Sequence, residues 1–235
     1  MNSMAQPTTA QIPTLLRGEV EPMRGWLADR SPGGIALYIG VVVAGASLFG
    51  AAIGLWRAPM QALFNGIKFP LVILAVSAGN ALLNAILAPL LGLNLRFREC
   101  FVAILMSFAI AAAILGAFSP LVAFMIWNTP PYGQNWQAYS FLLLSLVVMI
   151  AFAGVAANVR LVELLRKLSP NPGIARNVLL AWLAGNLFLG SQLCWILRPF
   201  VGSPGLPVQF IRPDALRGSF FEAVFYALKS LFFPA

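Results

Sequence analysis

The chain has 235 residues, of which 60% are hydrophobic and 9% are charged, with 15 Lys and Arg, 7 Asp and Glu, and no His. Its mean hydropathy is +0.86, and a soluble core of this size could not bury so much apolar surface. The composition therefore excludes an ordinary soluble domain. The net charge is +8, and the Lys and Arg residues responsible for it flank apolar stretches. We therefore expect these residues to bind anionic lipid headgroups and not nucleic acid.

The N-terminal segment, residues 1–33, lacks the basic start, short apolar run and cleavage site of a signal peptide. We therefore expect the first span to stay in the mature chain. Within this segment apolar residues recur at helical spacing opposite Arg17, Glu21 and Arg24, with Pro22 interrupting the pattern. This pattern predicts a helix lying on the membrane surface. Its apolar face would be Leu16, Val20, Met23 and Leu27.

Residues 34–197 contain five apolar stretches, each long enough to cross a bilayer as a helix of about 20 residues. Between residues 100 and 159 there is no charged residue at all. We predict an all-α, polytopic transmembrane bundle with spans at 34–56, 69–93, 101–127, 137–159 and 177–197. Pro70 fits the first turn of the second span, and Pro120 can bend the third. Residues 60–67 are interpreted as a surface turn between the first two spans.

Basic residues are distributed unevenly over the connections between spans. With the N-terminus inside, the cytoplasmic segments hold Arg17, Arg24, Arg30, Arg96, Arg98, Arg160, Arg166, Lys167 and Arg176. The outer segments hold fewer, namely Arg57, Lys68, Arg198, Arg212, Arg217 and Lys229. This bias predicts a cytoplasmic N-terminus and an outer C-terminus. We expect the location to be the inner, or cytoplasmic, membrane of a bacterium.

Small residues form a strip along the first span, where Gly50 and Gly54 follow Gly40, Ala44 and Ser47. Such strips let two helix backbones approach closely. The strip indicates either a contact inside this chain or a contact with a partner or a second copy.

Polar side chains are concentrated on one face of the second span, which carries Ser77, Asn80 and Asn84 at helical spacing. Hydrogen bonds between such groups fix helix neighbours, whereas converging polar groups would line a cavity. Candidate partners for these amides are Ser47, Asn186 and Gln192.

The C-terminal region, residues 198–235, combines a Pro-rich loop with an amphipathic helix. Four prolines between residues 199 and 213 exclude a helix there. Arg198, Phe200 and Arg212 lie in this loop, and Asp214 is predicted to cap the last helix. The loop is either an ordered cap over helix ends or a docking surface for another subunit. The apolar face of the last helix would be Phe220, Phe221, Val224, Phe225, Leu228, Leu231 and Phe232.

No combination of residues predicts catalysis or cofactor binding. The chain has no His, and Ser203 has no adjacent base. Phosphate-binding Gly motifs are absent, and two isolated Cys do not form a metal site. We therefore expect no catalytic residues, no cofactor and no metal.

The stretch Leu91-Gly-Leu-Asn-Leu-Arg-Phe-Arg-Glu99 is followed by the Pro120-containing span. Together they resemble bacterial relatives of the Yip domain family over residues 69–125. The segment Arg198-Pro-Phe-Val-Gly-Ser-Pro204 is similar to one in uncharacterised bacterial membrane proteins. The resemblance implies a five-span membrane protein and supplies no site residues.

The leading hypothesis is a non-catalytic membrane protein that works by association, as a scaffold, an assembly factor or a small subunit of a complex. Its partners would be membrane lipids and other membrane protein subunits or a second copy. The alternative is a channel or transporter component with a polar path along the second span. A third hypothesis is a lipid-acting enzyme, for which Arg198, Arg212 and Asp214 would have to converge.

Overall fold

The computed structural model describes residues 13, 14, 17, 19–28, 32–201, 206–222 and 225. Over these residues the regular structure is helical, and five helices are long and apolar enough to cross a membrane. They are α3 (Pro32–Leu55), α4 (Pro59–Leu90), α5 (Phe97–Trp127), α6 (Trp136–Leu168) and α7 (Pro172–Ile196). The prediction of an all-α bundle with five spans is confirmed.

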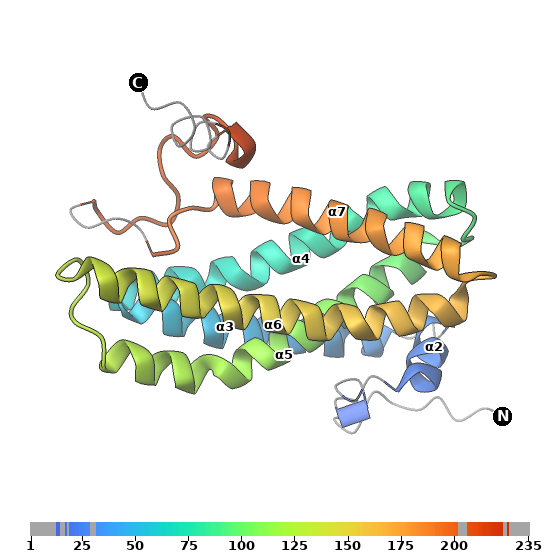
Figure 1. Ribbon diagram of the computed structural model, residues 1–235, viewed down its shortest axis with the longest axis horizontal. Coiled ribbons are helices and arrows are strands. Elements are labelled where there is room, and N and C mark those ends of the chain that lie inside the picture. The colour runs from blue at the N-terminus through green and yellow to red at the C-terminus, as the bar shows by residue number, and fades with distance from the viewer. Residues whose placement is uncertain are drawn as a thin grey trace.

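The five long helices pack so that α3 contacts both α4 and α5, while α6 packs on α5 and α7 packs on α4 (Figure 1). The helices α6 and α7 converge at their connecting loop and diverge away from it (Figure 1). The short helix α2 (Val20–Ala28) lies at one end of the bundle. The described part of the C-terminal segment, residues 198–201 and 206–222, lies at the other end (Figure 1). An odd number of spans places them there.

The helix α4 starts earlier than predicted. Residues 60–67 belong to this helix and are not a surface turn, and Pro70 lies inside it and not in its first turn. Because proline has no N–H, the carbonyl of Gly66 loses its helical partner. The hydroxyl of Ser47 on α3 donates a hydrogen bond of 2.7 Å to that oxygen. The neighbouring helix therefore satisfies the carbonyl that Pro70 leaves open.

The small-residue strip of α3 is used for packing inside the chain. A Cβ atom at Gly50 would lie 2.6 Å from the carbonyl oxygen of Asn65, and one at Gly54 would lie 2.5 Å from the backbone of Ala62. Both contacts are with α4. Gly45 and Gly116 provide the corresponding close approach between α3 and α5. At Gly50 and Gly54 the strip therefore makes close contacts within the chain.

The predicted N-terminal helix is present as α2, and its apolar residues Met23 and Leu27 are buried. It packs on α5 and α6. The Nζ atom of Lys167 lies 2.7 Å from a carboxylate oxygen of Glu21, which ties α2 to α6. Leu16 and Arg30 lie outside the described residues.

The cap predicted at Asp214 is wrong. Residues 220–222 and 225 are helical, and the Ser219 hydroxyl accepts a hydrogen bond of 3.1 Å from the backbone N–H of Glu222. Asp214 lies in a turn and pairs with Arg198 at 3.3 Å. A hydroxyl closer to the helix start provides the cap. Ser203, Pro204, Val224, Leu228, Lys229, Leu231 and Phe232 lie outside the described residues.

Candidate functional site

Three polar side chains of α4 bind the loop that follows α7. The Nζ atom of Lys68 lies 2.7 Å from the carbonyl oxygen of Pro199. The Nε2 atom of Gln61 lies 3.0 Å from the oxygens of both Pro199 and Phe200, and Nδ2 of Asn65 lies 2.8 Å from that of Phe200. Each carbonyl oxygen thus accepts from two side chains, which uses both of its lone pairs. We call these five residues the polar anchor.

Lys68 is fully buried in the polar anchor. Its ammonium lies 5.5 Å from the ring centre of Phe200 and 5.2 Å from that of Phe210, in cation–π contacts. Across the described residues, no carboxylate lies within 4.0 Å of Nζ. A carbonyl and two aromatic rings therefore take the place of a counter-ion, which burial of a charge normally requires.

The anchor depends on helical spacing. Gln61, Asn65 and Lys68 follow one another at four and three residues and share one face of α4. The Nε2 atom of Gln61 also lies 2.9 Å from Oδ1 of Asn65, so its two N–H groups are shared among three oxygens. Asn65 and Lys68 are close to Pro70, so the polar face and the helix-breaking residue belong to the same stretch of α4.

Further contacts hold the C-terminal segment in place. Arg198 donates to the backbone oxygen of Trp195 at 2.8 Å, stacks over its ring at 3.8 Å and pairs with Asp214. Arg57, in the connection between α3 and α4, donates to the carbonyl of Leu206. The rings of Phe64 and Phe210 meet edge to face at 5.4 Å. The segment is thus bound to the α3–α4 connection, to α4 and to the end of α7.

Several apolar side chains of the C-terminal segment are exposed. Leu216 is 83% exposed and Phe221 is 42% exposed. A hollow of about 280 Å³ lies in the same segment, and Arg212 and Asp214 are among its lining residues. We call the following set the exposed apolar residues of the C-terminal segment: Leu206, Ile211, Leu216, Phe220 and Phe221.

The three charged groups named for a lipid-acting enzyme lie in one neighbourhood. Arg198 binds the carboxylate of Asp214, and both Arg212 and Asp214 line the hollow. Asp214 is the one described lining residue whose side chain could act as a base. The three groups thus share one neighbourhood, in which Arg198 and Asp214 are paired with each other.

The amides of the second span form a separate, buried cluster. The Nδ2 atom of Asn80 donates to Asn186 Oδ1 at 2.6 Å and to the Trp182 carbonyl at 3.0 Å, both on α7. Asn84 donates back to Asn80 at 2.7 Å. Ser77 bonds within its own helix to the carbonyl of Ile73. The cluster joins α4 to α7 through side chains that bind each other.

Two predicted partners of these amides are bound elsewhere. Gln192 accepts from the backbone N–H of Phe220 at 3.4 Å, and Ser47 serves the Gly66 carbonyl. Asn186 is therefore the partner among the three candidates. The others are too far along their helices to share the same level of the bundle.

An aromatic cluster lies at the end of the bundle that holds the C-terminal segment. The Trp56 ring lies 5.1 Å from the Tyr132 ring and 5.5 Å from the Tyr139 ring. Burial, together with the neighbouring Tyr139, raises the pKa of Tyr132, although Arg57 acts in the opposite direction. Trp and Tyr are enriched where a bilayer meets water, so this cluster suits a membrane interface.

Sequence reasoning missed the polar anchor. The spacing of Gln61, Asn65 and Lys68 was a usable signal, since it places all three on one helix face.

Comparison with protein-family models, curated proteins and solved structures finds no match for this chain.

Proposed function

We propose that this chain is a non-catalytic integral membrane protein that works by association with another membrane protein subunit. It would act as a scaffold, an assembly factor or a small subunit of a complex, and the C-terminal segment would be its docking surface. The observation that carries the proposal is the buried Lys68, whose ammonium holds an irregular segment that exposes apolar side chains.

The cost of burying a charge supports this assignment. Removing an ammonium from water costs several kcal/mol even after relaxation. Ionisable residues inside membrane helices are rare and commonly functional. Here the ammonium contacts the carbonyl of Pro199 and two aromatic rings of the C-terminal segment. A fixed docking surface benefits from such anchoring, because less conformational entropy is lost when the partner binds.

The position of the segment favours a partner that is itself in the membrane. Phe221 stacks on Phe188 of α7 with ring centres 5.4 Å apart. Phe188 belongs to an exposed apolar side of α7 that also carries Leu180 and Leu187. The exposed apolar residues of the C-terminal segment therefore continue the apolar surface of a spanning helix.

The proposal includes the location and orientation. The N-terminus would be cytoplasmic, the C-terminus outside, and the membrane the cytoplasmic membrane of a bacterium. The distribution of Lys and Arg supports this orientation. Bacterial Yip-like five-span proteins would be its relatives, as the stretch from Leu91 to Glu99 suggests.

The experiment compares two exposed leucines at opposite ends of the bundle. Leu216 is 83% exposed and Leu90 is 77% exposed, so Leu216→Gln and Leu90→Gln make the same change. The tagged chain is expressed in its native membrane, extracted in mild detergent and purified, and bound proteins are quantified by mass spectrometry. We expect one membrane protein to co-purify and Leu216→Gln to reduce its recovery about tenfold, the effect of losing a central contact. Leu90→Gln should leave the recovery unchanged.

The other outcomes bear on the proposal directly. A monomer that purifies without any stoichiometric partner contradicts it. Equal losses with both variants would mean that the leucines act through membrane insertion or folding. If the partner is a second copy of this chain, the docking surface remains and the complex is homomeric, not heteromeric.

A further inference from the structure

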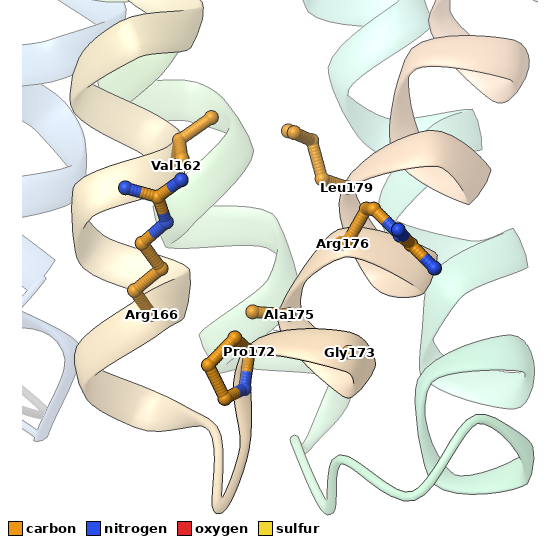
Figure 2. Close-up of a pocket in the computed structure, with 7 residues that line it drawn as sticks. All are labelled: Val162, Arg166, Pro172, Gly173, Ala175, Arg176 and Leu179. Carbon is orange, nitrogen blue, oxygen red and sulfur yellow. The ribbon is translucent and has the colours of Figure 1, made fainter.

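A second hollow lies at the opposite end of the bundle, where α6 and α7 meet. Its volume is about 310 Å³, which is within the size of small-molecule sites, about 300–1,000 Å³. Figure 2 shows the side chains of α6 and α7 on either side of the opening. The lining residues are Val162, Arg166, Pro172, Gly173, Ala175, Arg176 and Leu179.

The charge of this hollow is positive. Arg166 and Arg176 line it, and its described lining contains no carboxylate. Both side chains are exposed. Neither makes a hydrogen bond or an ion pair with any residue in the described part of the chain. The nearest acidic residue on α6, Glu163, is already paired with Arg160 at 3.4 Å. Both guanidinium groups can therefore bind an anion, and in Figure 2 that of Arg166 lies beside Val162 while that of Arg176 points away from α6.

The walls above the arginines are apolar. On α6, residues 155, 159 and 162 precede Arg166 at helical spacing and so share its face. On α7, Leu180 and Leu187 follow Arg176 in the same way. Val155, Val159, Leu180 and Leu187 are all exposed. The basic hollow therefore lies next to exposed apolar residues of both α6 and α7.

We propose that this hollow binds the headgroup of an anionic phospholipid, with the acyl chains along the exposed apolar residues of α6 and α7. Arginine suits this ligand because its planar guanidinium donates two parallel hydrogen bonds to a phosphate. Basic pockets between spanning helices at a membrane surface have the same combination of charge and apolar wall. A free phosphate would use the arginines but not the exposed apolar residues beside them, so these residues favour the lipid.

The test uses the purified full-length chain with equimolar phosphatidylglycerol and phosphatidylcholine of identical acyl chains, and native mass spectrometry counts each bound lipid. We expect wild type to prefer phosphatidylglycerol. Arg166→Gln and Arg176→Gln should each lower that preference about fivefold, and together about 25-fold, the effect expected for one and two basic groups at a membrane surface.

The matched control is Lys167→Gln, which removes the same charge from the same end of α6. Lys167 is ion-paired with Glu21 and does not line the hollow, so the preference should stay within about twofold, because an exposed ion pair contributes little. An equal loss with Lys167→Gln would overturn the proposal in favour of general surface charge. Retention of the wild-type preference by the double variant would also overturn it.

Two further measurements do not depend on the variants. Thermal unfolding of wild type in nanodiscs should occur at a higher temperature with phosphatidylglycerol than with phosphatidylcholine alone, because a ligand of the folded state stabilises it. No difference between the two nanodiscs counts against the site. If inorganic phosphate displaces phosphatidylglycerol at equal concentration, the ligand of the hollow is a soluble anion and the lipid proposal is overturned.

Discussion

The ammonium of Lys68 and the carbonyl of Pro199 lie 2.7 Å apart although 131 residues separate them in the chain. This contact brings the end of the last span back onto the start of the second one. Two neighbouring amides, those of Gln61 and Asn65, complete the polar anchor. The C-terminal segment is thus part of the folded bundle, and its exposed apolar residues have fixed positions.

Replacement of Lys68 by Met should release the C-terminal segment. A hydrogen bond to a charged group contributes about 1.5–3 kcal/mol, so opening of the segment should become about 10- to 100-fold more frequent. Hydrogen exchange of peptides from residues 206–217 measures this opening. Lys167→Met, at an exposed lysine on α6, is the control and should leave these peptides unchanged. Exchange at the wild-type rate in Lys68→Met would show that the anchor does not hold the segment.

Replacement of Ser47 by Ala should destabilise the fold through Pro70. The Gly66 carbonyl would lose the Ser47 donor, and a buried carbonyl without its hydrogen bond costs about 1–3 kcal/mol. Unfolding in detergent, followed by circular dichroism, should show the loss. Ser145→Ala is the matched control, since the Ser145 hydroxyl bonds within its own helix to Phe141. Similar stability of the two variants would argue against this role of Ser47.

Replacement of Gly45 by Ala should weaken the packing of α3 on α5. A methyl group there would overlap the Ala112 carbonyl, and such overpacking costs about 1–3 kcal/mol. Gly40→Ala is made in the same helix, where a Cβ has nothing within 4 Å, and should be neutral or slightly stabilising because Ala favours helix. Thermal unfolding temperatures compare the two. Equal temperatures would contradict the close approach of these helices.

Asn80 and Asn186 should show a coupling energy of about 0.6–2 kcal/mol, the range for side-chain hydrogen bonds between membrane helices. A double-mutant cycle with Asn80→Ala and Asn186→Ala measures it through the free energy of unfolding. Additive single effects would mean that the 2.6 Å bond between these amides does not contribute to stability.

The helices could be predicted because long apolar stretches in a bilayer have one solution, a helix that satisfies its own backbone. The start of α4 could not be predicted, because Lys68 and Pro70 together indicate a helix boundary. That indication fails here since Ser47 on α3 satisfies the open carbonyl. A donor on another helix, 19 residues earlier, is not visible in the local pattern.

The candidate site was predictable only in part. The pairing of Asn80 with Asn186 follows from two amides on two spans. The acceptors of the polar anchor are backbone carbonyls of Pro199 and Phe200, and every residue carries such a group. No residue type marks them, so the role of Lys68 emerges only when the chain is folded.

The central claim is that the C-terminal segment contacts another membrane protein, and photocrosslinking in native membranes tests it most directly. A photoreactive amino acid is placed at position 216 in one strain and at position 90 in another, since Leu216 and Leu90 are similarly exposed. We predict one discrete protein adduct from position 216 and none from position 90. The absence of a protein adduct at position 216, or the same adducts from both positions, would contradict the claim.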